Sequence, residues 1–143
     1  MNKKELEESL TFSPRYNEDG LIPCITICAK SGDVLMFAYM NDTALNKSIE
    51  TGEAHYWSRS RQELWHKGAT SGLTQKIVEM RTDCDQDCIL IKVEIGNSNN
   101  NDRIEASCHT GRKSCFYREI KTGSKAGMHF IDADKIFDPD DVY

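Results

Sequence analysis

An acidic motif at positions 83–87, Asp-Cys-Asp-Gln-Asp, constrains the fold more than any other feature of this sequence. Residues 75–82 before it alternate well enough for one strand, and the apolar alternation of residues 89–95 predicts another. In a straight strand the three aspartates would share one face, and Cys84 would point to the other. Because aspartate tolerates turns, we expect the motif to form a loop or bulged corner that joins the two strands.

The rest of the sequence predicts short strands, few helices and no internal repeat. Asn41 or Asp42 can cap the clearest helix, which carries Leu45 and Ile49 on one face and ends at Gly52. We therefore expect an α+β fold, a compact and mostly β single domain with few short helices. The other expected elements are a peripheral helix at 3–10, a hairpin of strands 24–28 and 34–39, aromatic strands at 55–57 and 64–66, a polar loop at 97–102, a strand at 128–131 and a short helix beginning in 132–137.

Length and composition limit the class of protein. A chain of 143 residues fits one domain, residues 1–143, that can bury a core without staples. No apolar stretch has the length of a membrane span or the pattern of a signal peptide, so we expect a cytoplasmic protein and not a membrane protein. In a reducing cytoplasm the six cysteines suit metal binding, catalysis or the core better than disulfides. The net charge of −5 indicates no general attraction to nucleic acid.

The cysteines and aspartates together offer ligands for two different metals. Thiolates prefer a soft or borderline ion such as zinc, whereas clustered carboxylates suit a hard ion such as magnesium. Cys84, Cys108 and Cys115 lie in polar, glycine-containing surroundings that favour a metal-binding loop over a core position. The remaining cysteines lie in apolar runs, and we interpret them as core residues: Cys24, Cys28 and Cys88.

Histidine and basic residues near these motifs suit an anionic substrate. His109 adjoins Cys108, and because histidine titrates near neutral pH it is a candidate to move protons beside a metal. The other histidines are interpreted as strand residues with satisfied rings: His55, His66 and His129. The basic residues beside the Cys108 loop and the aromatic strands are interpreted as phosphate ligands: Arg59, Arg61, Lys67, Arg112 and Lys113.

Five ordered motifs are more specific than any of these residues alone. They are Val-Leu-Met-Phe-Ala-Tyr-Met at 34–40, Glu-Ala-His-Tyr-Trp-Ser-Arg-Ser-Arg at 53–61, Leu-Trp-His-Lys-Gly at 64–68, the acidic motif at 83–87, and Cys-His-Thr-Gly-Arg-Lys-Ser-Cys-Phe-Tyr-Arg at 108–118. In this order they resemble the phosphoribosyl-AMP cyclohydrolase family of histidine biosynthesis. The match is collinear across roughly residues 20–118, which leaves 119–143 as a C-terminal extension and predicts a monofunctional enzyme.

The resemblance implies a hydrolase that opens the adenine ring of phosphoribosyl-AMP between N1 and C6 and gives the formimino-carboxamide ribonucleotide. It also implies a homodimer that needs zinc and magnesium, with the zinc site completed across the dimer. Carried onto the matching positions, the implied zinc ligands are Cys84, Cys108 and Cys115, and the implied magnesium ligands are Asp83, Asp85 and Asp87.

This chemistry agrees with the residue types. A zinc ion with three protein ligands keeps a fourth position for a water of lowered pKa, which would add to C6. Three thiolates donate much charge and weaken that acidification, so we expect a base such as His109 to help. The residues expected to contact the substrate base or its phosphates are Trp57, Arg59, Arg61, Trp65, Lys67 and Arg112. The chain departs from the family at Ala69, where glutamate is common, and Glu63 is a candidate substitute.

Two other classes fit parts of the pattern. A binding module without catalysis could hold structural zinc with Cys84, Cys88, Cys108 and Cys115, but six residues separate the second pair, and structural zinc sites space both pairs two to four apart. A zinc-dependent base deaminase would show His-x-Glu and Pro-Cys-x-x-Cys, and the sequence contains neither.

Overall fold

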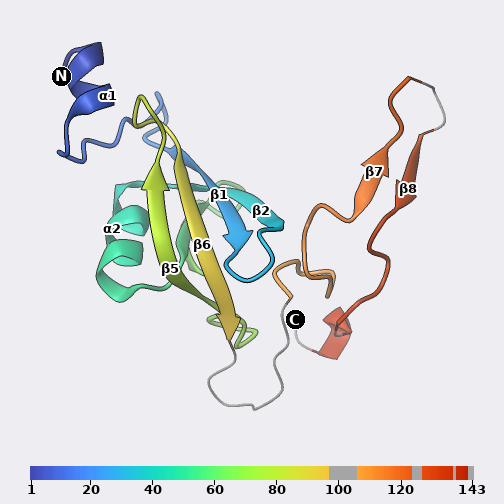
Figure 1. The fold of residues 1–143 in the computed structure, drawn as a ribbon. Helices are drawn as coiled ribbons and strands as arrows, with labels where there is room; N and C mark the ends of the chain where they lie inside the picture. The colour runs from blue at the N-terminus through green and yellow to red at the C-terminus, as the bar shows by residue number, and fades with distance from the viewer. Residues whose placement is uncertain (97–105, 124–126, 137, 142–143) are drawn as a thin grey trace.

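A six-stranded sheet forms the body of the protein in the computed structural model, which describes residues 1–96, 106–123, 127–136 and 138–141 (Figure 1). The strand order of this sheet is β4-β3-β2-β1-β6-β5, and β7 and β8 form a separate pair. The strands are β1 (Ile22–Cys28), β2 (Val34–Met40), β3 (His55–Ser58), β4 (Glu63–His66), β5 (Thr74–Thr82), β6 (Ile89–Gly96), β7 (Arg118–Ile120) and β8 (Met128–Phe130). The helices are α1 (Lys3–Glu8), α2 (Asp42–Thr51) and the short 3-10 helix η1 (Pro139–Asp141).

One parallel pairing, between β1 and β6, joins strands that are otherwise antiparallel. Cys24 lies opposite Ile89, and Cys28 lies opposite Val93. The start of β1 and the β5–β6 turn therefore lie at one end of the sheet. The β1–β2 turn lies at the other end. These two ends separate the candidate site residues.

The sheet curls, so that β5 also meets the segment before β3. Glu53 and Lys76 form an antiparallel bridge. The backbone N–H of Ala54 donates to the carbonyl of Gln75 at 2.9 Å, and that of Ile77 donates to the carbonyl of Gly52 at 2.7 Å. These bonds hold the aromatic strands β3 and β4 close to the start of β5.

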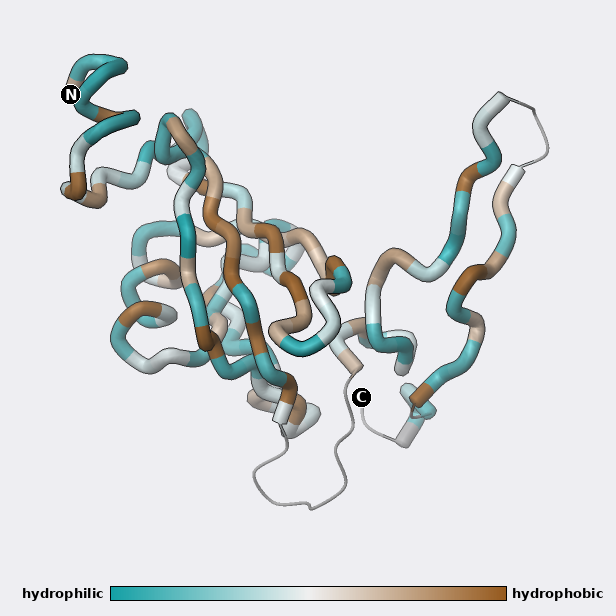
Figure 2. The backbone as a smooth tube through the Cα atoms, in the orientation of Figure 1, coloured by the Kyte–Doolittle hydropathy of each residue, from teal (hydrophilic) through white to brown (hydrophobic). Residues whose placement is uncertain are grey.

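Alternating side chains of β1 and β6 fill the core. In β1 every second residue from Ile22 to Cys28 is buried, and Ile89, Ile91 and Val93 of β6 are fully buried beside them. Figure 2 shows the corresponding apolar residues along the central strands. The interpretation of Cys24 and Cys28 as core residues is confirmed, with 0% and 6% of each residue exposed. Cys88 is half-buried.

Helix α2 begins and ends where the sequence predicts. The Asn41 side chain accepts a hydrogen bond from the backbone of Ala44, and Gly52 ends the helix at a φ of 73°. Its buried residues are Ala44, Leu45 and Ser48. Ile49, expected on the buried face, is 51% exposed. Ser48 is buried because its hydroxyl bonds both to the helix and to the backbone of His55.

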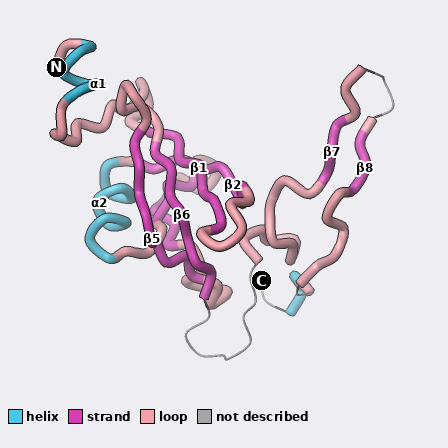
Figure 3. The backbone as a smooth tube through the Cα atoms, viewed as in Figure 1, coloured by secondary structure: helices cyan, strands magenta, loops and turns pink. Residues whose placement is uncertain are grey.

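The C-terminal hairpin of β7 and β8 stands away from the six-stranded sheet (Figures 1 and 3). β8 confirms the strand predicted at 128–131. The helix predicted to begin at residue 132 is wrong for residues 132–136, which contain no helix. The chain instead bonds back to distant residues, since the N–H of Ile136 donates to the carbonyl of Gly111 at 2.6 Å and that of Ile131 to Tyr117 at 3.0 Å. Residue 137 and the predicted loop at 97–102 lie outside the described residues.

The fold is mostly β with two short α-helices, as expected from the sequence. Within the described ranges, no helix combines the length and the apolar character that a membrane span needs.

Candidate functional site

The acidic motif forms the turn between β5 and β6, as the sequence predicts. A carboxylate oxygen of Asp83 accepts the backbone N–H groups of Asp87 at 3.0 Å and Cys88 at 3.1 Å. Gln86 takes a φ of +59°, which is uncommon for a residue other than glycine. This turn brings the ligand oxygens of Asp83, Asp85 and Asp87 within 4.8 Å of one another. No other set of three His, Cys, Asp or Glu residues meets so closely in the described part of the chain.

The three carboxylates of this turn lie close enough to repel one another when they are charged. Hydrogen bonds to Asp85 and Asp83 raise the pKa of Asp87 to about 6. The same bond from Asp87 holds the pKa of Asp85 below its usual value. A divalent cation removes this repulsion, and a set of oxygen ligands alone suits a hard ion.

Gln86, which sequence reasoning did not select, ties the N-terminal segment to the acidic turn. It is 3% exposed, and its side-chain oxygen accepts the N–H of Ser13 at 2.7 Å. Its amide nitrogen donates to the carbonyls of Leu6 at 3.1 Å and Thr11 at 3.3 Å. The N–H of Arg15 donates to the Gln86 carbonyl at 2.7 Å. A glutamine among aspartates carries no sequence signal for such a role.

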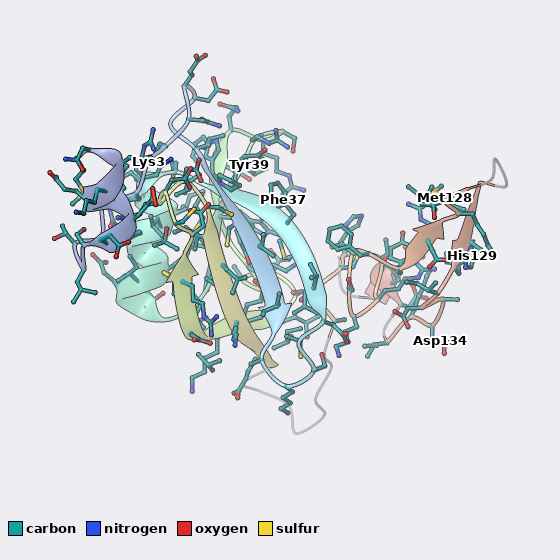
Figure 4. All side chains as sticks on the ribbon, turned by 45° about the horizontal axis from the view of Figure 1, so that its top comes forward. Lys3, Phe37, Tyr39, Met128, His129 and Asp134 are labelled. Atoms are coloured by element: carbon teal, nitrogen blue, oxygen red, sulfur yellow. The ribbon has the colours of Figure 1, made fainter. Side chains whose placement is uncertain are left out.

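A cavity of about 600 Å³ lies between the N-terminal segment and the acidic turn. Its volume is in the range of small-molecule sites. Two cationic side chains face it together with one candidate magnesium ligand. Figure 4 shows Lys3 on α1 at this end of the molecule. The lining residues are Met1, Lys3, Leu6, Ser13, Pro14, Arg15 and Asp85.

Cys108 and Cys115 lie at the opposite end of the sheet, beside the β1–β2 turn. The N–H of Cys115 donates to the carbonyl of Leu35 at 2.7 Å. Lys113 forms an ion pair with Asp33, in the β1–β2 turn, at 3.1 Å. The loop from residue 107 to residue 115 is therefore fixed against the start of β2.

The sulfur atoms of Cys108 and Cys115 interact directly. Cys108 is 4% exposed, and its sulfur accepts a hydrogen bond from the Thr110 hydroxyl at 3.0 Å. Cys115 is exposed as a residue, but protein atoms shield its thiol from water. This burial is the main cause that raises the pKa of Cys115 to about 12, and the charge of Cys108 and a hydrogen bond with Cys108 act in the same direction. The two thiols therefore form a pair that is poorly solvated without a metal.

Cys84 does not meet this pair within one chain. It is exposed in the acidic turn, where it lines a cavity with Leu6 and Phe12 of the N-terminal segment. None of the six cysteines is in a disulfide. Cys84 and Cys88 thus lie at one end of the sheet and the other two candidate ligands at the opposite end. This placement argues against a four-cysteine structural site inside one chain.

The structure gathers part of the predicted substrate set around β2 and β3. The Arg59 guanidinium lies 4.3 Å from the centroid of the Tyr39 ring, and Tyr39 pairs with Trp57 across the strands. Figure 4 shows Tyr39 next to Phe37 along β2. Arg61 is exposed and lies 4.0 Å from Glu63. The substrate roles of Trp57, Arg59 and Arg61 stay predictions.

The other predicted substrate residues lie elsewhere. Trp65 is 39% exposed, and the ammonium of Lys67 lies 4.9 Å from its ring centroid. Lys67 itself is only 4% exposed. The guanidinium of Arg112 lies 4.1 Å from the centroid of Tyr117 and donates to the carbonyl of Ala133 at 3.3 Å. These placements do not bring the predicted phosphate ligands to one point.

Three histidines have structural partners, as expected. His55 stacks on His66 with 4.3 Å between ring centroids, and His66 lies 3.1 Å from a carboxylate oxygen of Glu53. Burial lowers the pKa of His55. His129 pairs with Glu119 at 3.2 Å. His109 is exposed beside Cys108, and its role in proton transfer stays a prediction.

A buried polar chain, also missed from sequence, runs from the core to the cysteine loop. The Tyr56 hydroxyl donates to the side-chain oxygen of Gln75 at 2.6 Å and therefore accepts from Thr26 at 2.7 Å. Gln75 then donates to the Ser107 hydroxyl at 3.2 Å. These four residues are at most 2% exposed. The sequence does not indicate this chain of hydrogen bonds, because threonine, tyrosine and glutamine are ordinary strand residues and only the folded sheet brings these ones together.

Comparison with known proteins places this chain among named relatives. The family model for phosphoribosyl-AMP cyclohydrolase matches residues 36–117. A phosphoribosyl-AMP cyclohydrolase of Bradyrhizobium diazoefficiens is 55% identical over 140 residues, covering 97% of this chain and 94% of the relative. Relatives of the same name from Nitrobacter hamburgensis and Nitrobacter winogradskyi are 52% and 50% identical, covering 96% and 99% of this chain and 90% and 94% of the relatives. The chain therefore belongs to the phosphoribosyl-AMP cyclohydrolase family and carries that activity, a hydrolytic step of histidine biosynthesis.

Proposed function

We propose that this chain opens the adenine ring of phosphoribosyl-AMP in a site that two copies of the chain build together. The observation that carries the proposal is the separation of the candidate sulfur ligands between the two ends of one sheet. Zinc binds each sulfur at about 2.3 Å, so ligands at opposite ends cannot share an ion within one chain. In a two-fold dimer each end of one copy can face the other end of its partner. The proposed zinc ligands are Cys84 from one copy and Cys108 and Cys115 from the other.

The paired thiols fit a soft ion. Cys108 and Cys115 already contact each other and leave room in a tetrahedral set for a third sulfur and a water. The Thr110 hydroxyl on the Cys108 sulfur is the kind of outer partner that orients a ligand. A reducing cytoplasm, which we propose as the location, keeps such thiols unbridged.

Exposed apolar side chains support a second copy. Phe37 and Val34 of β2 are 49% and 45% exposed, next to the loop that carries Cys115. The C-terminal hairpin exposes Ile120, Met128 and Phe130. Large apolar side chains grouped in this way mark interaction surfaces. We propose that the partner copy covers them.

Cys84, Cys108 and Cys115 would hold the zinc ion, and its Lewis acidity would make an attacking water more acidic. The residues of the chain then move the protons. His109 accepts a proton as the water oxygen forms its bond to C6 of the substrate. When the C6–N1 bond breaks, the same imidazole is placed to return a proton to N1, while the hydroxyl on C6 loses its remaining proton to solvent as the C=O bond forms. Trp57 and Trp65 are proposed to pack on the base, and Arg59, Arg61 and Arg112 to hold phosphate oxygens.

Magnesium is proposed at the acidic turn, where the ligand oxygens of three carboxylates converge. Replacing Asp85 with asparagine removes one charged ligand, so the Mg²⁺ concentration needed for half-maximal turnover should rise by about tenfold or more. Titrating Mg²⁺ in a ring-opening assay measures this shift. The exposed Asp19, replaced in the same way, is the matched control. An Asp85→Asn titration that overlays the wild type would remove Asp85 from the ligand set.

His109→Ala should lower turnover by about 10²- to 10⁴-fold, because a positioned acid–base group contributes that much. The KM for phosphoribosyl-AMP should change little, since His109 is not proposed to bind the substrate. Steady-state kinetics on the variant separate the two constants. A KM that rises as much as turnover falls would reduce His109 to a positioning role.

Removing zinc with a chelator tests the proposed function as a whole. Ring opening of phosphoribosyl-AMP, followed by absorbance, should stop and should return when zinc is added back. Far-ultraviolet circular dichroism of the stripped protein should stay close to that of the untreated protein, because the site is open and catalytic. Global unfolding on chelation would instead assign the zinc a structural role.

A further inference from the structure

Lys67 is a buried cation, and no carboxylate in the described part of the chain pairs with it. Its residue is 4% exposed, and its ammonium donates to the carbonyl of Ser107 at 2.7 Å. Among the ion pairs of the described residues, none includes Lys67. Burying an unpaired charge is strongly unfavourable, so a lysine at this position needs a compensating group.

The compensating group that the geometry shows is the carbonyl of Ser107, one residue before Cys108, which accepts a hydrogen bond from the ammonium at 2.7 Å. The Trp65 ring, 4.9 Å from the ammonium, adds a cation–π contact but no charge.

Lys67 is also held in place by the fold. It follows β4 directly, and its backbone N–H donates to the carbonyl of Ala54 at 3.1 Å. From this position its side chain holds the backbone of Ser107, the residue before Cys108. Gln75 holds the hydroxyl of the same serine. The base of the cysteine loop is thus fixed to the core at two atoms of Ser107.

We propose that Lys67 is a positioning residue of the zinc site. Its ammonium fixes the Cys108 loop through the Ser107 carbonyl and so holds Cys108 in position to bind the ion. This inference rests on the proposed sulfur-ligated zinc. It gives Lys67 a different role from the phosphate contact expected from the sequence, and the two roles make different predictions.

The test compares Lys67→Met with Lys76→Met, a matched change of an exposed lysine on β5. Both proteins and the wild type are loaded with Co²⁺, whose sulfur-to-metal charge-transfer absorption reports thiolate ligation, and metal affinity is measured by chelator competition. We expect Lys67→Met to weaken metal binding by about 10- to 100-fold, the usual effect of losing an outer partner. The Lys76→Met protein should match the wild type.

Two further readouts separate a positioning role from the alternatives. The melting temperature of metal-free Lys67→Met should fall by only a few degrees, because the loss of the bond to the Ser107 carbonyl is offset by replacing a buried charge with an apolar side chain of similar length. Its KM for phosphoribosyl-AMP should stay within about twofold of the wild type, since the substrate contacts are unchanged.

Three results have different meanings. Unchanged metal affinity with a raised KM would make Lys67 a phosphate ligand and overturn the inference. An unfolded or strongly destabilised Lys67→Met protein would make its role structural and overturn it as well. A wild-type protein without the charge-transfer band would instead overturn the proposed sulfur-ligated site itself.

Discussion

Cys115→Ser should lower ring-opening turnover by at least about a thousandfold, because a Lewis acid that supplies several kcal/mol to the transition state is lost with its ligand. The stability of the fold should change little. Cys115 is exposed, and the bond that fixes its segment runs from its backbone to Leu35, which serine keeps. Turnover of the zinc-loaded variant, with bound zinc measured by metal analysis, tests this.

Cys88→Ser is the matched control for that change. Cys88 is half-buried next to the acidic turn and is not a proposed ligand. Its serine variant should therefore keep bound zinc and most of its activity. Loss of zinc from Cys88→Ser would instead favour the four-cysteine structural module.

Gly68→Ala should destabilise the protein by about 3 kcal/mol or more, the range of mutations that force backbone atoms apart in a packed region. Gly68 takes a φ of +90°, and a Cβ at this position would lie 2.3 Å from the backbone nitrogen of Thr74. Backbone atoms cannot give way as a flexible side chain can. For a chain of this size such a loss lowers the melting temperature by about 10 °C, which differential scanning calorimetry measures.

Gly20→Ala separates the contribution of the positive φ from that of the contact between an added Cβ and the backbone. Gly20 has a similar φ of +74° but no atom within 4 Å of an added Cβ. It should therefore lose only about 1 kcal/mol, the effect of backbone strain alone. A Gly68→Ala protein as stable as Gly20→Ala would show that the close approach of Thr74 does not exclude a Cβ at position 68.

The ends of a helix and the positions of strands could be predicted because they depend on residues that are close together in the sequence. The cap residues Asn41 and Gly52 determine where α2 begins and ends, and alternating apolar residues predict β5 and β6. The acidic turn follows from the preference of aspartate for bends. The predicted helix after residue 131 failed because long-range bonds, such as that from Ile136 to Gly111, replaced local ones.

The arrangement of the site could not be read from the sequence alone. Which end of the sheet each cysteine occupies depends on the parallel pairing of β1 with β6, a contact between residues far apart in the chain. The buried partners Gln75 and Ser107 depend on the same long-range packing. The same pairing places Cys84 and Cys115 at opposite ends of one sheet, which supports a site shared by two copies.

Mixing two inactive variants tests the shared site most directly. Cys84→Ser and Cys115→Ser would be unfolded together in equal amounts, refolded and assayed with phosphoribosyl-AMP. In random dimers half are mixed, and each mixed dimer carries one intact site, so about a quarter of wild-type activity should return. A refolded mixture no more active than either variant alone would show that the cysteines of one site come from one chain.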